Sequence, residues 1–548
     1  MAYDDLLKHL GGFGRYQKRT YFLLCLPAIT CAFHRLATVF IAPKALHRCL
    51  MPYETAGNAN FTLPVDRPVN LSLPWDESTG NWSQCLRLDA NFTEQYFQDG
   101  LPNSETVPCQ DWVFDHSKYM SSLVFEWNLV CDKGWLRSLA DTVFMLGILI
   151  GAVAFGHLSD RYGRKPIFFF SLVLQVVGGV AASFAPEFFT FVLARLFLGM
   201  STSGVYLVAY IIGMEMVSPS KRIYAGVIIH YFFTIGYILT AFIAYAIKDW
   251  RQLQIALSLP GIAFFVYWWF IPESARWLLA KGRDAEAEKI LKKIAKVNGI
   301  DLSDGTLDKF LRDSQQEGDK SEQTRQASIF DLFKYPNLRR NSLIIFFLWF
   351  VNNCSYYGLS WNVSNLGGND YLNFLISGLV EIPAYTFILF ALDRLGRKVT
   401  LCGSMLVGGC ALLLCILVPD DCSWLLITLA MIGKMALTAS YGVVYIFSAE
   451  QFPTVVRNAA MGVSSTAARL GGILAAFIHD LADVWKPLPL IVIGTLALLA
   501  GVSSLILPET LRKTLPETIE DGEQFGRRSK EVKNEVTEAA WESKEAEK

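Results

Sequence analysis

Several ionisable side chains inside long apolar stretches of this 548-residue chain could do chemistry on a solute. They are His34, Arg35, Asp141, Arg195, Glu381, Lys434 and Arg469. A charge at the depth of a lipid bilayer is costly, so each is a candidate for handling a charged solute. For Asp141 and Arg195 a structural role is the alternative. Glu381 and Arg469 could instead neutralise each other, or each could pair with Lys434, because a buried ion is normally paired.

Aromatic rings at helical spacing form a second group of candidates. They are Tyr206 with Tyr210, Tyr441 with Tyr445, and the set Trp349, Tyr356 and Tyr357. A spacing of four residues places both rings of a pair on one face of a helix. A ring face attracts ammonium groups and also stacks on flat anions. Each ring could instead belong to a packed core or to an interfacial belt.

A short charged motif occurs twice in the chain. Its first copy runs from Gly156 to Lys165 and contains Asp160, Arg161, Gly163 and Arg164. Its second copy contains Asp393, Arg394, Gly396 and Arg397, and it follows six apolar stretches later. Such a repeat is typical of transporters built from two parallel halves with a site between them. The glycines allow a tight turn, and the acid and base can hold two helices together on one side of the membrane.

The elements that position these residues are twelve apolar stretches, each close to the roughly 20 residues that cross a bilayer. They span about 21–41, 137–158, 167–185, 188–212, 223–246, 252–271, 341–361, 371–391, 399–418, 424–446, 459–480 and 487–507. The sequence therefore predicts an all-α membrane protein of 12 transmembrane helices in two six-helix halves.

Seven segments follow from this pattern. They are a cytoplasmic N-terminus (1–20), the first helix (21–41), an extracellular loop domain (42–136), helices 2–6 (137–271), a cytoplasmic loop with amphipathic helices (272–340), helices 7–12 (341–507) and a cytoplasmic tail (508–548).

The orientation follows from the short loops. Loops after the even-numbered stretches carry Lys and Arg, whereas the loops after stretches three, seven and nine carry none. Positively charged loops stay in the cytoplasm, so both termini are predicted inside and the 42–136 segment outside.

The long external segment independently supports this orientation. It contains four cysteines, Cys49, Cys85, Cys109 and Cys131, and four Asn-x-Ser/Thr acceptor sites, Asn60, Asn70, Asn81 and Asn91. We expect two disulfides, since cysteines beside glycosylation sites indicate an oxidising compartment. The sequence does not determine which cysteines pair.

Composition and motifs exclude several other classes. The net charge of -1 does not favour nucleic-acid binding, and 52% of the residues are hydrophobic. The chain has no Walker loop, no His-Glu-x-x-His motif and no Cys-x-x-Cys motif. We therefore expect that it is not an enzyme and that it binds no metal and no cofactor. The expected partners are the lipid bilayer, a small organic ion and, as an option, a coupled sodium ion or proton.

Further motifs resemble one transporter family. They are Arg195-x-x-x-Gly199, Glu215 with Arg222, the segment 272–278 (PESARWL), Glu450-x-x-Pro453-Thr454 with Arg457, and the segment 507–510 (LPET). Together with the repeated motif they resemble the organic cation, carnitine and organic anion transporters of the major facilitator superfamily, including insect members named organic cation transporters. The resemblance implies alternating access, gates built from the charged motifs, broad substrate range, a plasma-membrane location and a central cavity lined by the aromatic positions above.

The family pattern also bears on substrate class. Glu381 resembles the acid of the cation and carnitine branches, whereas Arg469 stands where anion and carnitine members have arginine. We therefore predict a polyspecific carrier of organic cations and zwitterions, with Glu381 for amines and Arg469 for carboxylates. An organic anion exchanger that uses Arg35, Lys434 and Arg469 is the first alternative. A non-transporting membrane receptor is an alternative of another class.

Overall fold

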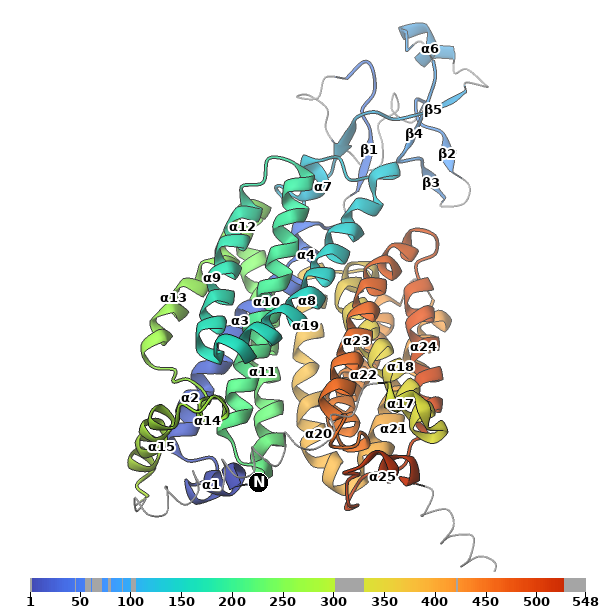
Figure 1. Cartoon of the computed structure of the whole chain (residues 1–548). Helices are drawn as coiled ribbons and strands as arrows, with labels where there is room; N and C mark the ends of the chain where they lie inside the picture. The colour runs from blue at the N-terminus through green and yellow to red at the C-terminus, as the bar shows by residue number, and fades with distance from the viewer. Residues whose placement is uncertain are drawn as a thin grey trace, which may run out of the picture.

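A computed structural model describes residues 2–44, 46–54, 61, 71–76, 80–90, 92–99, 105–300, 330–419 and 422–526. Two bundles of long helices stand side by side, and a small domain with short strands covers one end (Figure 1). We call that end the outer end. The segments 2–14 and 508–526 lie at the opposite end, which we call the inner end. We call residues 15–271 the N half and residues 336–507 the C half.

The N half begins with a span that is divided by Pro27. Its parts are α2 (Arg15–Cys25), α3 (Pro27–Leu36) and α4 (Thr38–Ile41). Proline cannot donate a backbone hydrogen bond, so the ladder of helical hydrogen bonds is interrupted there. The following helices are α8 (Trp135–Tyr162), α9 (Arg164–Ser183), α10 (Phe188–Met216) and α11 (Arg222–Ala246).

The sixth predicted span differs from a single helix. It consists of α12 (Trp250–Ser258), α13 (Pro260–Ala263) and the 3₁₀ segment η3 (Phe264–Trp269). Pro260 interrupts the ladder of backbone hydrogen bonds in the middle of this stretch. It is consequently absent from the ten described helices that are long and apolar enough to cross a membrane.

The C half repeats the arrangement. Its helices are α18 (Pro336–Trp361), α19 (Asp370–Leu379), α20 (Glu381–Leu395), α21 (Arg397–Leu414), α22 (Ser423–Gln451), α23 (Arg457–Asp480) and α24 (Leu488–Ser504). Short 3₁₀ segments η4 (Asn362–Leu366), η5 (Cys415–Leu417) and η6 (Leu481–Asp483) follow α18, α21 and α23. The helix α24 is apolar but only 17 residues long.

Small residues bring the helices of each half into close contact. A Cβ atom at Gly236 of α11 would lie 2.5 Å from the carbonyl oxygen of Ile29 on α3. The equivalent position in the C half is Gly471 of α23, where a Cβ atom would lie 2.1 Å from the carbonyl oxygen of Phe350 on α18. Glycine at these two positions therefore permits the same close helix packing in both halves.

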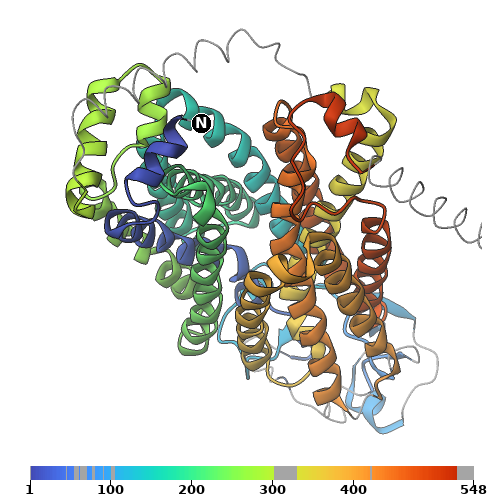
Figure 2. The same cartoon turned by 90° about the horizontal axis from the view of Figure 1, so that it is seen from below.

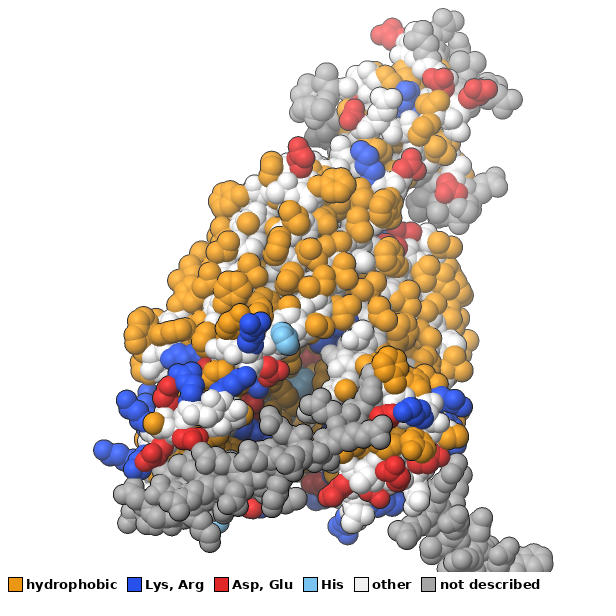
Figure 3. Space-filling view, viewed as in Figure 1, with side chains coloured by type: hydrophobic (Ala, Val, Ile, Leu, Met, Phe, Trp, Pro, Cys, Tyr) orange, Lys and Arg blue, Asp and Glu red, His pale blue; other side chains and the backbone are white. Residues whose placement is uncertain are grey.

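The two halves meet along two seams. The helix α8 packs against α23, and α11 packs against α19 and α20. Large apolar side chains, including Val153, Phe170, Phe189, Trp424 and Leu499, are exposed on the outer surface of the bundles. Figure 3 shows this apolar surface, which lipid tails would cover.

Short helices cover the inner end. They are α1 (Ala2–His9), η2 (Pro219–Lys221), α14 (Ala275–Ala280), α15 (Asp284–Asn298), α17 (Asp331–Lys334) and α25 (Ile519–Gln524). The amphipathic helix α15 buries Ala287, Leu291 and Ile294, and Asn298 at its end donates to the carbonyl of Leu10 at 2.8 Å. Viewed from below, α1 and α15 lie beneath the N half, and α17 and α25 lie beneath the C half (Figure 2).

The outer domain consists of three two-stranded antiparallel sheets. Its elements are β1 (His47–Cys49) with β6 (Trp112–Phe114), β2 (Trp75–Asp76) with β3 (Asn81–Trp82), β4 (Leu86–Leu88) with β5 (Thr106–Pro108), and the helices α6 (Glu94–Asp99), α7 (Leu123–Glu126) and η1 (Cys131–Lys133). The predicted disulfide-linked domain is confirmed, with pairs Cys49–Cys109 and Cys85–Cys131. Asn81 is exposed on β3, whereas Asn60, Asn70 and Asn91 lie outside the described residues.

Candidate substrate cavity and its gates

Glu381 is held by a partner from its own half. It lies at the start of α20 with 0% of its surface exposed, and Nζ of Lys434 on α22 lies 3.4 Å from its Oε1 atom. The hydroxyl of Thr234 on α11 donates to its Oε2 atom at 2.8 Å. The acid predicted to bind amines is therefore already neutralised by a lysine ammonium.

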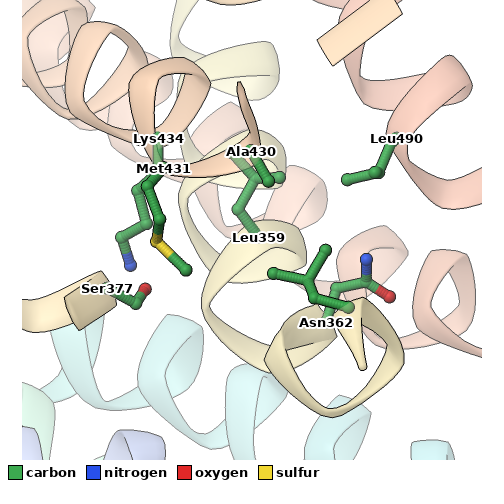
Figure 4. A pocket seen from close by; sticks show the side chains of 8 residues that line it. Leu359, Asn362, Ser377, Ala430, Met431, Lys434 and Leu490 are labelled. Carbon is green, nitrogen blue, oxygen red and sulfur yellow. The ribbon is translucent and has the colours of Figure 1, made fainter. Parts of the chain in front are cut away.

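Lys434 also makes contacts across the seam between the halves. Its ammonium donates to the hydroxyl of Ser360 at 2.5 Å and to the hydroxyl of Tyr237 at 3.2 Å. It lies 4.6 Å from the ring centroid of Tyr237 and 4.9 Å from that of Tyr356. A small cavity lies beside it, lined by Lys434, Ser377, Met431, Leu359, Asn362 and Leu490 among others (Figure 4). The pair and its hydroxyl partners form one polar cluster on α11, α18, α20 and α22.

Two other candidate bases, Arg35 and Arg469, have no such partner. Arg35 on α3 donates to the hydroxyl of Tyr357 at 3.2 Å, and its guanidinium lies 5.4 Å from the ring centroid of Tyr206. Arg469 on α23 is half-buried and interacts electrostatically with Tyr441. Among the described residues, no ion pair joins either guanidinium to a carboxylate. The predicted neutralisation of Glu381 by Arg469 is thus not the one observed.

The predicted aromatic residues form a continuous group in the C half. Tyr356 stacks on Tyr441 with ring centroids 5.7 Å apart, and Tyr441 lies 5.5 Å from Tyr445. Trp349 follows at 4.2 Å from Tyr445, and its indole donates to Ser448 at 2.8 Å. We call Tyr356, Tyr357, Tyr441 and Tyr445 the tyrosine group.

The N half contributes fewer of these positions. Tyr206 packs on Phe233 at 6.3 Å, and Tyr210 faces the same side and interacts electrostatically with Tyr445. His34 is fully buried, and its carbonyl accepts a hydrogen bond from Arg195 at 3.1 Å. Arg195 also pairs with Asp141 at 2.9 Å, which links α3, α8 and α10. These three residues join helices to one another within the N half.

Some residues in or near the polar cluster were not predicted from the sequence. Thr234, Tyr237 and Ser360 contact the buried ion pair, and Tyr385 packs on His230 at 5.1 Å. They lie among apolar residues, in stretches whose composition is typical of ordinary membrane spans. The available signal was the recurrence of Tyr231, Thr234 and Tyr237 at three-residue spacing on one face of α11.

The charged motifs at the inner end form equivalent networks in the two halves. In the N half, Arg164 pairs with Asp160 and with Glu215 at 3.3 Å. In the C half, Arg397 pairs with Glu450 at 3.2 Å and lies 3.7 Å from Asp393. The exposed Arg161 and Arg394 lie beside these networks.

A carboxylate caps the helix after each motif. Glu273 accepts from the backbone amide of Arg164 at 2.9 Å, and Glu509 accepts from the amide of Arg397 at 3.0 Å. Burial raises the pKa of Glu273 despite its hydrogen bonds with backbone amides. Burial also acts on Glu509, but four backbone amides outweigh it and lower its pKa. The N-terminus of a helix favours such an anion.

Two arginines of the charged motifs bind groups other than the acid that accompanies them in the motif. Arg222 pairs with Asp4 of α1 at 2.6 Å rather than with Glu215. Arg457 donates to the carbonyl of Phe452 at 3.2 Å, while Glu450 binds Arg397 and the hydroxyl of Thr510. At Gly156 a Cβ atom would meet its nearest neighbour at 3.9 Å, so no tight contact requires glycine there.

The two ends of the molecule differ in how the halves touch. Every ion pair described above at the inner end joins residues of one half together with its own terminal segment. At the outer end, Arg137 of α8 pairs with Asp480 of α23 at 2.9 Å, which crosses between the halves. Figure 3 shows a hollow between the halves toward the inner end. The structure is therefore closed at the outer end and open at the inner end.

Comparison with known proteins agrees with this architecture. Residues 119–521 match the family model described as sugar (and other) transporter. The chain is similar to a solved proton:xylose symporter, XylE, with a TM-score of 0.60 at 16% identity, covering 92% of this chain and 98% of that one. At this identity the likeness shows the fold.

Relatives with higher identity narrow the family. The chain is 52% identical to the organic cation transporter protein of Drosophila melanogaster, covering 96% of each. It is 35% identical to the β-alanine transporter of the same organism, covering 95% of this chain and 89% of that one. This multi-pass chain therefore belongs to the organic cation, carnitine and organic anion transporter family of the major facilitator superfamily.

Proposed function

We propose that this chain carries small organic ions across the plasma membrane by alternating access, with both termini in the cytoplasm. We further propose that its preferred substrates carry a carboxylate together with an amine. The proposed substrate class rests on one observation. Lys434 forms an ion pair with Glu381, whereas Arg35 and Arg469 have no carboxylate partner among the described residues. The candidate site thus offers positive anchors and aromatic faces, and its candidate acid, Glu381, is already paired.

The cavity matches both ends of a zwitterion. A guanidinium binds a carboxylate with two parallel hydrogen bonds, so Arg35 or Arg469 can hold the acidic end. The ring faces of the tyrosine group attract the ammonium end. The name of the Drosophila β-alanine transporter supports this reading, because β-alanine is an amine that carries a carboxylate. A plain cation would have to bind through the rings alone or displace Lys434.

A substrate panel tests the proposal. Uptake of β-alanine, tetraethylammonium and an aromatic carboxylate should be compared in expressing cells, with sodium, pH and voltage varied separately. In Arg469→Gln and Arg35→Gln, β-alanine uptake should fall by about tenfold or more, since a charged hydrogen bond contributes about 1.5–3 kcal/mol. Tetraethylammonium uptake should not fall. The matched control is Arg339→Gln, which removes an exposed arginine at the inner end.

Two outcomes would assign the carrier differently. If β-alanine uptake survived both cavity substitutions, the guanidinia would not be the carboxylate anchors. If the aromatic carboxylate alone were transported and external dicarboxylate accelerated its efflux, the chain would be an organic anion exchanger. The same two unpaired guanidinia favour that second candidate.

A counterflow measurement addresses the receptor alternative. Vesicles loaded with unlabelled substrate should take up labelled substrate faster than empty vesicles. Acceleration from the opposite side requires a carrier that returns across the membrane, which a receptor does not provide.

A further inference from the structure

The outer end is closed by charged contacts that cross between the halves. Both oxygens of the Asp480 carboxylate are engaged from the first turn of α8, one by Arg137 at 2.9 Å and the other by Ser138. Lys44, which follows α4, pairs with Asp483 of η6. None of these residues belongs to a charged motif or to the candidate substrate site.

A third contact comes from the outer domain. The hydroxyl of Tyr119 donates to Asp370 at the start of α19 at 3.3 Å, and Lys118 lies 3.6 Å from the same carboxylate. The outer domain belongs mechanically to the N half. Ser121 donates to Asp249 at 2.6 Å, and Glu126 accepts from the indole of Trp250 at 2.9 Å.

All three contacts have the same polarity. The N half with its outer domain contributes the bases Lys44, Lys118 and Arg137, whereas the C half contributes the acids Asp370, Asp480 and Asp483. When the halves separate at this end, one wall of the opening becomes positive and the facing wall becomes negative.

A cavity lies directly beneath these contacts. It has a volume of about 20 Å³, enough for about one water molecule, and Lys44, Arg137, Ser138, Asp141, Trp361 and His479 are among its lining residues. The indole of Trp361, one of these lining residues, donates to the backbone carbonyl of Arg35 at 3.4 Å. Below the charges, Phe40 of the N half stacks on Tyr371 of the C half at 5.1 Å and completes the closure.

We propose that these three acid–base contacts form the outer gate and that their charges, once parted, form an entry site for zwitterions. A zwitterion can bridge the opening, with its carboxylate on Arg137 or Lys44 and its ammonium on Asp480 or Asp483. A solute of one sign is attracted by one wall and repelled by the other. The entry site rests on the proposed function, because it assumes that such solutes are carried inward from this end.

Two matched double variants test the entry site. Asp480→Asn with Asp483→Asn removes two of the three acids of the acidic wall, and Lys44→Gln with Arg137→Gln removes two of the three bases of the basic wall. The measurement is initial uptake (Vmax/KM per carrier at the cell surface) for β-alanine, tetraethylammonium and an aromatic carboxylate. The single variants Asp483→Asn and Lys44→Gln alter the most exposed pair and serve if a double variant fails to reach the surface. Asp89→Asn, an exposed acid of the outer domain, is the control.

The expected result is an opposite change in selectivity. The double variant of the acidic wall should lower the β-alanine to carboxylate ratio by about two- to fivefold, and the double variant of the basic wall should lower the β-alanine to tetraethylammonium ratio by a similar factor. Both changes should shrink in high salt, which screens exposed charges. If uptake of all three solutes changed by the same factor, the entry site would be overturned, and the contacts would only hold the outer end closed. No change for any solute would overturn the gate as well.

Failure of the proposed function is visible separately. If the unaltered protein does not carry β-alanine, the substrate proposal fails in that measurement alone. The entry site is then judged from the two remaining solutes. The double variant of the acidic wall must favour the carboxylate over tetraethylammonium, and the double variant of the basic wall must do the reverse; an unchanged ratio overturns the proposal.

Discussion

At the scale of single residues, the ion pair between Glu381 and Lys434 is the feature that most changes the expected role of the candidate substrate-binding residues. Both side chains are almost wholly buried, with exposed fractions of 0% and 2%. Removing one member leaves an uncompensated buried charge, which typically costs about 3–5 kcal/mol. Removing both charges together leaves no such charge, so the two changes are not additive.

This non-additivity is a testable prediction. Glu381→Gln and Lys434→Gln should each lower the thermal stability of the purified protein, and the double variant should recover most of the loss. The measurement is the unfolding midpoint in one detergent, with Arg339→Gln as a surface control. If the double variant were as unstable as the sum of the singles, the two residues would not act as a pair.

Residue types in the cavity were predictable, whereas their partners were not. Charges inside apolar stretches are conspicuous, so Arg35, Glu381, Lys434 and Arg469 could be selected from the sequence. Pairing depends on how each helix is rotated and shifted against its neighbours, which helical spacing alone does not determine. Glu381 therefore binds Lys434, and Arg222 binds Asp4 of a terminal helix that no motif connects to it.

At the scale of elements, the turn of each charged motif depends on a glycine. Gly163 has a φ of +112° and Gly396 a φ of +92°, values that other residues rarely adopt. A Cβ atom at either position would also lie 2.6 Å from the capping carboxylate, Glu273 or Glu509. The turn and the helix cap therefore occupy the same small space.

Substitution of these glycines should affect both halves alike. Gly163→Ala and Gly396→Ala should each reduce stability by at least about 1–2 kcal/mol, because the backbone strain adds to displacement of the cap. The check is the unfolding midpoint together with uptake. Gly403→Ala is the matched control, since no atom lies within 4 Å of a Cβ placed there. A stable, active Gly396→Ala protein would show that the turn tolerates a side chain.

The cap on α21 gives a dependence on pH. The pKa of Glu509 is lowered in the folded protein, so its stabilising contribution is present at neutral pH and is lost as the pH falls through that lowered pKa. Glu509→Gln should reduce stability by about 0.5–1 kcal/mol at neutral pH and have less effect in acid. Unfolding midpoints measured from neutral to acidic pH check this. An effect that is the same at every pH would assign the loss to packing.

The succession of helices was largely predictable, because about 20 apolar residues in a row leave few alternatives. Interruptions within them were harder to predict. Pro27 interrupts the first span without ending it, and Pro260 divides the sixth into short pieces. Proline within a membrane helix can either kink it or end it, and packing decides between these outcomes.

At the scale of the whole molecule, the difference between the two ends makes accessibility measurable. The inner end is open, so Tyr445→Cys should react with a thiol reagent applied from the inner side and should be protected by bound substrate. A membrane-impermeant reagent applied from the outer side should react slowly. The unaltered protein, which has free cysteines of its own, provides the background. Fast reaction from the outer side would contradict the closed outer gate.

The two-half architecture could be predicted from the apolar stretches and the repeated motif, but the conformational state could not. Two halves with the same motifs can close at either end, and the sequence is identical in both states. The contacts that distinguish the ends, such as Arg137 with Asp480, join residues 343 positions apart and belong to no motif.

The attachment of the outer domain to α12 also has a practical consequence. An antibody fragment bound to β2 and β3 would travel with the N half and mark its orientation in images without selecting a state. A fragment whose epitope includes Lys118 and Asp370 would instead bind only molecules whose outer end is closed. It would inhibit transport by holding the outer end closed.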